Sequence, residues 1–255
     1  MNEISVTILT RNVEHSIEAC LNSLIGIADE IIVVDSFSTD RTLEICHHYG
    51  CKITQRKFSG FGAQRQYATS LTRYDYVLSI DSDEVLTPQL RESILELKKN
   101  GLTDHRVYKV KRRNFFCGTP VKHCGWRPDH VIRLFNKRYA NWNIADIAET
   151  IEFPETLRPA LLKGEMMHYR ATSIDKLNET EDSHAALRGK VIAAKGHPIQ
   201  AIAPIAYGIK AYMSTFFRHG GVLEGEIGRQ IARRNYRSEV MAYRTARKII
   251  KQQNA

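Results

Sequence analysis

The chain has 255 residues, of which 43% are hydrophobic and 25% charged, an ordinary balance for a globular protein with a sizeable core. No apolar run reaches the ~18 residues that a membrane-spanning helix needs. The first residues also lack the basic segment of a secretory signal. Five cysteines without regular spacing favour free thiols in a reducing compartment, so we expect a cytoplasmic protein.

The net charge of +9 is distributed unevenly along the chain. Residues 186–255 hold 13 Lys and Arg against 3 Asp and Glu, whereas residues 1–185 hold 24 against 25. The positive excess therefore belongs to the C-terminal part of the chain. Such asymmetry indicates a polyanionic partner, which is either a nucleic acid or an anionic membrane surface or glycolipid.

Strand and helix patterns alternate through the first hundred residues. Apolar and β-branched runs predict four strands, at residues 4–9, 30–34, 51–54 and 76–80. Helical spacing predicts four helices, near residues 17–24, after 38–40, over 63–71 and over 88–97. The last of these helices has Thr87 as its expected N-cap and Pro88 at its first position. This alternation is typical of a parallel βαβ sheet.

The alternation ends after Gly101. Alternating residues predict further strands over 105–114 and 129–135, with a long loop between them. We interpret these as antiparallel strands added to the parallel sheet. From Ser173 to the end the pattern is mostly helical and basic.

An acidic stretch, Asp81-Ser82-Asp83-Glu84, closes the strand expected at 76–80. Like charges this close cost free energy unless water, a counter-charge or a cation takes them up. Thr10-Arg11-Asn12 and Asp35 also follow expected strands, and ligands bind at the carboxyl ends of parallel strands. Oxygen ligands at this edge suit Mg²⁺ or Mn²⁺, which in turn would hold a diphosphate. The alternative is a solvated acidic turn.

Three segments in this order resemble the inverting glycosyltransferases of family 2, namely residues 4–12, 33–40 and 81–84. Four more segments resemble the lipopolysaccharide core branch of that family, which includes enzymes that add glucose to the first inner-core heptose. These segments are residues 60–68, 133–135, 168–169 and 220–225.

The resemblance implies an α/β protein with the GT-A fold, in which a mostly parallel sheet is flanked by helices. Residues 1–172 would form the catalytic domain, with a nucleotide-binding half at 1–100 and an acceptor half at 101–172. Residues 173–255 would form a basic helical extension. The implied activity is transfer of one sugar from a nucleotide-sugar such as UDP-glucose to the lipopolysaccharide inner core. The Gln-x-x-Arg-Trp motif of processive members is absent, which favours a single transfer.

The resemblance also implies roles for individual residues. The expected nucleotide contacts are Thr10, Arg11, Asn12, Asp35, Arg65 and Asp81. Asp83 would bind the Mg²⁺ or Mn²⁺ that bridges the diphosphate and neutralises charge on the leaving nucleotide. His168 is either a further metal or phosphate ligand or a structural histidine.

The general base is expected in the segment that contains Asp146 and Glu149, and we favour Glu149. The core branch tends to have Val-His-Glu where this chain has Ile147-Ala148-Glu149, so the histidine is missing and the carboxylate is kept. Trp126 and Arg127 are expected to line the acceptor sugar. The alternative for Trp126 is that it packs the loop in place.

The C-terminal region has apolar residues at helical spacing followed by arginines. They are Ile205, Ile209, Tyr212, Met213, Phe216 and Phe217, then Arg229, Arg233, Arg234 and Arg237. One interpretation is a core-packing helix followed by a solvated basic helix. The other, which we favour, is a peripheral anchor on the anionic inner face of the cytoplasmic membrane, or a funnel for a phosphorylated glycolipid.

Other functions remain open at this point. Within the same class, the acceptor is alternatively a polyprenyl phosphate or another surface glycan. A nucleotidyltransferase is disfavoured because no glycine-rich basic loop follows the first strand. From another class, the chain could be a nucleic-acid-binding protein on an inactive transferase fold. That is disfavoured because Asp35, Asp81 and Asp83 are all present and the basic residues are not interleaved with stacking aromatics.

Overall fold

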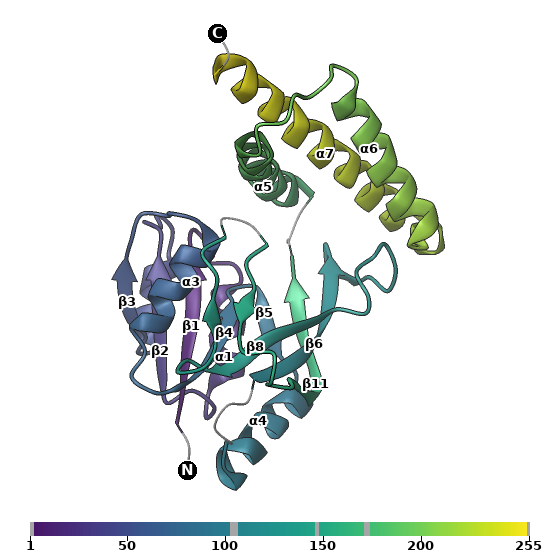
Figure 1. Cartoon of the computed structure of the whole chain (residues 1–255). Helices are drawn as coiled ribbons and strands as arrows, with labels where there is room; N and C mark the ends of the chain where they lie inside the picture. The colour runs from purple at the N-terminus through teal and green to yellow at the C-terminus, as the bar shows by residue number, and fades with distance from the viewer. Residues whose placement is uncertain (1–2, 103–106, 146–147, 171–173, 254–255) are drawn as a thin grey trace. The chain divides into compact units, whose positions relative to one another are not determined.

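The structure is a computed structural model that describes residues 3–102, 107–145, 148–170 and 174–253 (Figure 1). The chain forms two compact units. The first unit comprises Met1–Arg113 and Asp129–His168, and the second comprises Asn114–Pro128 and Tyr169–Ala255. The expected loop between the two later strands therefore belongs with the C-terminal helices by its contacts. The assignment of nucleotide-binding and acceptor halves stays a prediction.

A parallel sheet forms one side of the first unit, as the sequence predicts. Its strands are β1 (Ile4–Thr10), β2 (Glu30–Asp35), β3 (Lys52–Gln55) and β4 (Tyr76–Asp81). They lie in the order β3-β2-β1-β4, so β1 is central, with Ile8 beside both Val33 and Ile80. Because all four run in one direction, their carboxyl ends meet at one edge of the sheet.

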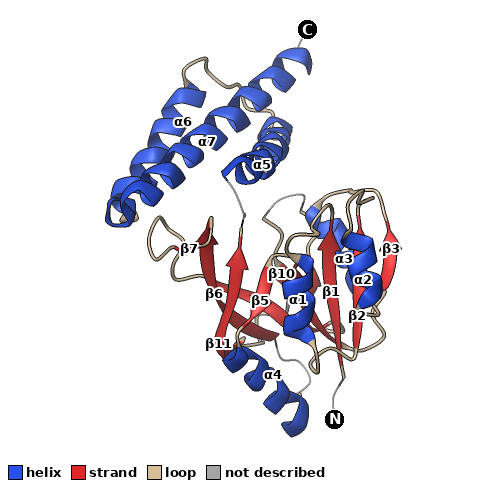
Figure 2. Ribbon diagram, turned by 180° about the vertical axis from the view of Figure 1, so that it is seen from behind, coloured by secondary structure: helices blue, strands red, loops and turns tan. Residues whose placement is uncertain are grey.

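Helices cover both faces of this sheet (Figures 1 and 2). The four expected helices are α1 (Ile17–Leu24), α2 (Thr42–His48), α3 (Phe61–Ser70) and α4 (Pro88–Asn100). Ile4, Val6 and Ile8 point to the face where α1, α2 and α4 contribute to the main buried cluster. Ile32 and Val34 point the other way and pack with Ala68 of α3. The period-2 alternation of the strands therefore distributes apolar side chains to both faces.

Antiparallel strands extend the sheet beyond β4, and two of them, β8 and β6, match the strands predicted at 129–135 and 105–114. They are β8 (His130–Asn136), β6 (Val107–Phe116), β11 (Ala160–Tyr169) and β5 (Glu84–Leu86), in that spatial order. Smaller pieces are β7 (Thr119–Pro120), which pairs with β6, and the separate pair β9 (Asn141–Trp142) and β10 (Ile151–Glu152). The sequence did not predict β5. It pairs with β11, where Glu84 lies opposite His168, and so brings the acidic turn back into the sheet.

The C-terminal part of the second unit is helical. Its elements are α5 (Ile174–Ala194), α6 (Ala203–Met213), the π-helical turn η1 (Ser214–Arg218), the 3-10 turn η2 (Gly221–Glu224) and α7 (Gly225–Gln253). The long α7 packs against α5 and α6. Gly208 permits the close approach of α6, because a Cβ there would lie 2.6 Å from Val240 and 2.9 Å from Tyr236. None of the described helices is both long and apolar enough to cross a membrane.

The end of α1 offers a matched test of the core. Leu24 is fully buried, whereas its neighbour Ile25 is 59% exposed. We expect Leu24→Ala to lower the free energy of unfolding by about 2–5 kcal/mol through lost burial and a cavity, and Ile25→Ala by less than about 1 kcal/mol. Urea denaturation followed by circular dichroism measures both. If both variants lowered the free energy of unfolding equally, the described position of α1 would be contradicted.

Candidate functional site

Three polar residues close neighbouring parallel strands. Thr10, Asp35 and Asp81 are the last residues of β1, β2 and β4. Thr10 lies beside Asp35, and Leu9 lies beside Asp81, so the three strand ends are level across the sheet. The structure therefore brings together the three strand ends that the sequence placed at one edge.

Asp35 organises two loops at this edge. Its side chain is fully buried. Its Oδ1 accepts hydrogen bonds from Thr10 Oγ1 at 2.9 Å and Ser38 Oγ at 2.5 Å, and its Oδ2 accepts from the Ser38 N–H at 2.8 Å and Gln55 Nε2 at 3.3 Å. Four protein donors thus hold this carboxylate. Its expected contact with the nucleotide stays a prediction, and the structure shows its part in shaping the loops.

The loop after β1 is tied to the loop after β2 through Asn12. The Asn12 N–H donates to Ser38 Oγ at 2.9 Å, and Asn12 Oδ1 accepts from the Thr39 N–H at 2.8 Å. Asn12 has a φ of 53°, a left-handed conformation in which asparagine is enriched. Arg11 and Asn12 are exposed, so these two predicted nucleotide contacts are accessible to a ligand.

Asp81 lies between two buried arginines. Its Oδ1 accepts from Arg65 Nη2 at 2.5 Å and its Oδ2 from Arg133 Nη2 at 2.6 Å, and these arginine side chains are only 7% and 5% exposed. Arg133 Nη2 also donates to Glu84 Oε1 at 2.7 Å, and Arg112 Nη1 donates to the same oxygen at 3.1 Å. Glu84 is fully buried, so the acidic stretch is not a solvated turn at this residue.

These contacts change the ionisation of Asp81. Burial by itself raises the pKa of the Asp81 carboxyl, but the positive charges of Arg133 and Arg65 outweigh burial and hold the pKa well below its usual range. Burial likewise lowers the pKa of Arg133, and the charges of Asp81 and Glu84 overcome it and raise that pKa. Asp81 is therefore ionised at neutral pH, and both of its oxygens are engaged by protein donors.

Glu149 is brought to the same edge by Arg65. Arg65 Nε donates to Glu149 Oε1 at 2.9 Å while its Nη2 donates to Asp81. One guanidinium thus joins two carboxylates that are 68 residues apart in the chain. The Arg65 guanidinium carbon also lies 4.6 Å from the centre of the Trp142 ring, a cation–π contact that restricts the arginine further.

Gly62 allows the Glu149 segment to approach α3. A Cβ at this position would lie 2.2 Å from Asn143 O and 2.7 Å from Ala145 O, and the Gly62 N–H donates to Ala145 O at 3.0 Å. Only glycine fits against that backbone. The start of α3 therefore holds both Arg65 and the segment that leads to Glu149.

Asp83 and His168 form the other acidic part of the site. Asp83 Oδ2 lies 3.4 Å from His168 Nε2, and their side chains are 27% and 10% exposed. Within the described part of the chain, no three His, Cys, Asp or Glu side chains converge as a metal site. Mg²⁺ is commonly held by one or two protein ligands together with substrate phosphates. This pair fits a site of that kind, and not an all-protein cage.

Trp126 and Arg127 lie in the second unit, in the loop 114–128. Trp126 is 8% exposed and packs with Phe116, Val121 and Ile231. Little of its ring is available to a sugar, so the structure favours the packing alternative for Trp126. Acceptor binding by Arg127 stays a prediction. Asp146 lies outside the described residues.

Sequence reasoning assigned no site role to three residues of this network, Arg112, Arg133 and Trp142, although segment 133–135 contributed to the family resemblance. Arg133 had a usable signal, because it is the one charged residue in the apolar run Val131-Ile132-Arg133-Leu134-Phe135, and a charge inside a buried strand requires a partner. Arg112 and Trp142 had no such signal. Their places depend on how distant strands and the β9 segment come together.

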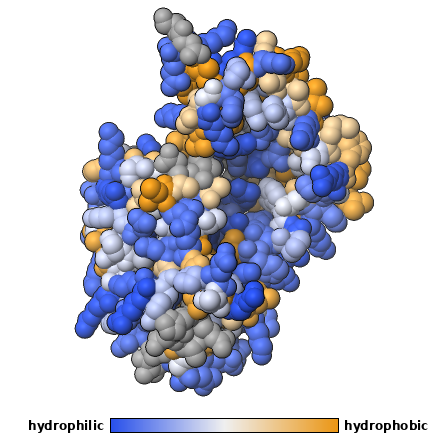
Figure 3. Space-filling view, viewed as in Figure 1, coloured by the Kyte–Doolittle hydropathy of each residue, from blue (hydrophilic) through white to orange (hydrophobic). Residues whose placement is uncertain are grey.

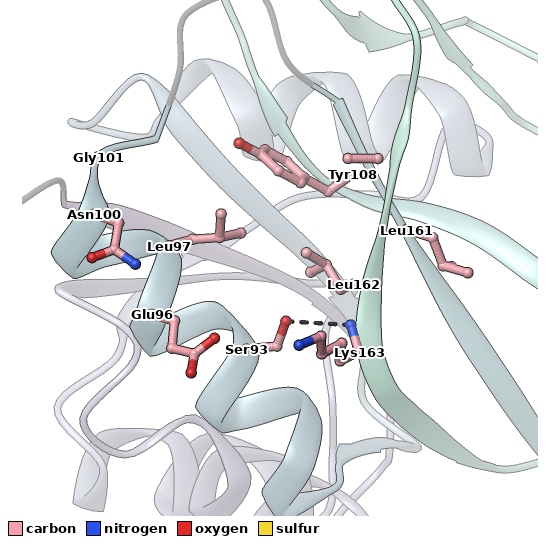
Figure 4. Close-up of a pocket in the computed structure, with 10 residues that line it drawn as sticks. Ser93, Glu96, Leu97, Asn100, Gly101, Tyr108, Leu161, Leu162 and Lys163 are labelled. Carbon is pink, nitrogen blue, oxygen red and sulfur yellow. Dashed lines mark hydrogen bonds between the residues drawn. The ribbon is translucent and has the colours of Figure 1, made fainter.

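A cavity of about 380 Å³ lies elsewhere in the first unit, between α4 and β11 (Figure 4). Its lining includes Ser93, Glu96, Tyr108 and Lys163, and the Lys163 N–H donates to Ser93 Oγ at 3.3 Å. None of the strand-end carboxylates lines it. This cavity is therefore not part of the site described above.

The stability of the network should depend on pH through Asp81. We expect Asp81→Asn to lower the free energy of unfolding by about 3 kcal/mol at pH 7, because two buried arginines lose a counter-charge. Since the folded-state pKa of Asp81 lies below its unfolded value of ~3.9, this stabilisation is present above pH ~4 and fades as the pH falls further. Urea denaturation at pH 7 and pH 3 tests this.

The matched control is Asp83→Asn, which removes a neighbouring carboxylate whose partner is His168. It should change stability by less than about 1 kcal/mol at pH 7. If Asp81→Asn lowers the free energy of unfolding by the same amount at pH 3 as at pH 7, the ionic origin of the effect would be contradicted.

A family model for glycosyl transferase family 2 matches residues 5–151. An uncharacterised glycosyltransferase of Rickettsia typhi is 30% identical over 204 residues, which are 77% of this chain and 70% of that protein. The lipopolysaccharide core biosynthesis glycosyltransferase LpsC of Rhizobium meliloti is 26% identical over 196 residues, which are 72% of this chain and 70% of that protein.

Among solved structures, the glucosyl-3-phosphoglycerate synthase of Mycobacterium tuberculosis is similar over 45% of this chain and 44% of its own. The TM-score is 0.36 and the identity 26%, and that structure is a complex with Mn²⁺, UDP and glucosyl-3-phosphoglycerate. The family match covers more than half of this chain, and its range includes the strand-end residues Thr10, Asp35 and Asp81 as well as Glu149. The chain therefore belongs to glycosyltransferase family 2 and has the GT-A fold.

Proposed function

We propose that this glycosyltransferase moves one sugar, with inversion, from a UDP-sugar to a lipopolysaccharide core acceptor. The observation that carries the site assignment is the bridge by Arg65, which joins Asp81 at the end of β4 to Glu149. The likeness to LpsC, whose name gives lipopolysaccharide core biosynthesis, supports the class of acceptor. The absence of the processive motif from the sequence supports a single transfer.

The donor end of the site is the edge formed by β1, β2 and β4. In this proposal the exposed Arg11 and Asn12 contact the nucleotide, and the bonds of Asp35 hold their loop in place. Asp81 is already bound by Arg65 and Arg133. Its proposed role is to orient these two guanidiniums, whose positive charge would favour a diphosphate at this edge of the sheet.

Asp83 and His168 are the residues that would hold Mg²⁺ or Mn²⁺ together with the donor diphosphate. The 3.4 Å separation of Asp83 Oδ2 and His168 Nε2 is short enough for one ion to replace their direct contact. When bound, such an ion would neutralise charge on the leaving diphosphate. Asp83 would also keep His168 oriented before the donor enters.

Glu149 is the proposed general base. Its carboxylate is oriented through Oε1 by Arg65, and Oε2 accepts no hydrogen bond from a described residue. The side chain is 15% exposed, so it is largely shielded from water but accessible. An acceptor hydroxyl that attacks the anomeric carbon would pass its proton to this carboxylate while the bond from sugar to diphosphate breaks.

Donor binding tests the role of Asp83. With UDP-glucose as the probe, calorimetric titration of the wild type should show binding at least tenfold tighter with Mn²⁺ than with a chelator. Asp83→Ala should remove most of that difference, because it removes the proposed carboxylate ligand of the metal. The control is Asp75→Ala, which removes an exposed carboxylate that pairs with Arg138 just before β4. Metal-independent binding, or binding unaffected by Asp83→Ala, would reject the metal role.

Turnover tests the role of Glu149. We expect Glu149→Gln to lower kcat by about 10²–10⁴-fold, the usual contribution of a general base, while the donor Kd stays within about threefold. Glu152→Gln, on the exposed side of β10, should keep wild-type kcat. Turnover is measured as release of UDP in the presence of the acceptor. Near-wild-type kcat in Glu149→Gln would exclude Glu149 as the base.

A further inference from the structure

We propose that the second unit docks on an anionic lipid bilayer through one surface, formed by α6, η1, η2 and the C-terminal half of α7. This concerns where the enzyme works, and it does not depend on which residue is the base or which sugar is moved. Four observations carry it: an exposed apolar face, a basic groove continuous with that face, the pairing of the nearby acids, and the fixed packing of α6 on α7.

The apolar face follows one side of α6 and continues into η1. Ile205, Ile209, Met213 and Phe217 recur every four residues, and each is between 40% and 58% exposed. Such spacing places side chains on one side of a helix. Pro204 and Gly208 of α6 are buried and the helix packs against α7, so the exposure is not a lack of packing. Figure 3 shows hydrophobic side chains gathered on the α6 side of this unit.

Exposed apolar residues are concentrated in this region. Half of the large hydrophobic residues that are exposed in the described chain fall within residues 202–223. Val222 and Leu223 of η2, a turn that contacts η1, are also 52% and 72% exposed. A contiguous apolar surface of this kind marks an interaction site more often than single exposed residues do.

A basic groove adjoins the apolar face. It has a volume of about 280 Å³ and is lined by Ala201, Pro204, Ile205, Arg244, Arg247, Lys248 and Lys251. Ile205 belongs to both the groove and the apolar face, so the two features are continuous. Among the described residues, none of the four cations of the groove forms an ion pair.

Acidic residues near this surface are already paired. Beyond residue 186 the chain has three carboxylates. Glu224 pairs with His123 at 2.8 Å, Glu226 with Arg229 at 2.5 Å, and Glu239 with Arg188. None of these three carboxylates pairs with a cation of the groove. An anionic partner would give the groove cations a counter-charge.

The groove and the face are held in a fixed relation by the packing of α6 on α7. The rings of Tyr207 and Tyr243 stack with their centroids 4.1 Å apart and their planes 3° from parallel. Gly208 lies against Tyr236 and Val240 of α7. The cations on α7 and the apolar side chains on α6 are thus presented together.

An anionic bilayer matches both features at once. Lipid tails accept an apolar helix face buried in the interface, and anionic headgroups attract clustered Lys and Arg. A nucleic acid would match only the charge, and the four groove cations are not interleaved with aromatic residues for base stacking. A second copy of this chain would add a net charge of +9 to the encounter. The bilayer is therefore the partner to which the surface is complementary.

Vesicle co-sedimentation of the full chain tests this proposal. We expect binding to vesicles of phosphatidylcholine with 30% phosphatidylglycerol at low salt, and at least tenfold weaker binding to phosphatidylcholine alone. Raising the salt concentration should weaken the binding to the anionic vesicles. No binding to anionic vesicles at low salt would overturn the proposal.

Two pairs of matched variants separate this surface from the overall charge. Lys248→Glu with Lys251→Glu should weaken vesicle binding at least tenfold, whereas Lys57→Glu with Lys99→Glu, the same charge change on the first unit, should weaken it less than threefold. Ile209→Ser with Phe217→Ser should weaken it tenfold, and Ile25→Ser with Leu161→Ser should not. The four test residues, Lys248, Lys251, Ile209 and Phe217, lie on the proposed surface. The four control residues, Lys57, Lys99, Ile25 and Leu161, are exposed residues of the first unit.

Equal losses for the test and control pairs would overturn the proposal, because net charge or general hydrophobicity would then explain the binding. Size-exclusion chromatography tests whether a second copy of the chain covers this face. If the wild type is a dimer that Ile209→Ser with Phe217→Ser disrupts, and the wild type does not bind vesicles, the face would be assigned to self-association instead. No readout here involves sugar transfer. Failure of this proposal would therefore leave the proposed function untouched, and the reverse also holds.

Discussion

The first unit depends on one buried guanidinium. Arg65 donates to Asp81 and to Glu149 and lies against Trp142, so a helix, a strand end and a distant loop meet at a single side chain. Burying a charge of this kind is unfavourable unless counter-charges and hydrogen bonds compensate it. Asp81, Glu149 and the neighbouring Arg133 supply that compensation. The arrangement of the site is therefore inseparable from the ion pairs that allow these charges to be buried.

Local patterns were sufficient for the parallel part of the fold. The β-branched runs and the cap at Thr87, whose side chain accepts from the Leu90 N–H, identified strands and helices, and parallel strands necessarily place Thr10, Asp35 and Asp81 at one edge. The three-residue β5 was not predictable, because its pairing with β11 joins segments about 80 residues apart. Arg112 and Trp142 were missed for the same reason, since their contacts come from tertiary pairing and not from local periodicity.

The structure adds a positioning role to two carboxylates of the site. Asp35 and Asp81 were both expected to contact the nucleotide, and that contact stays a prediction. Protein donors hold both oxygens of each carboxylate, so both residues fix the positions of their neighbours. In the second unit, the uneven charge of the sequence indicated an anionic partner. The structure adds the exposed face of α6 and the groove beside it, which no count of charges could locate.

The central claim is that Arg65 holds Glu149 in position to act as the base. A double-mutant cycle on kcat, with Arg65→Met, Glu149→Gln and the double variant at saturating donor, tests it most directly. If the two residues act as a unit, the double variant should be about as slow as Glu149→Gln alone. If instead the fold losses in kcat of the two single variants multiplied in the double variant, the two residues would act independently and the account would be contradicted.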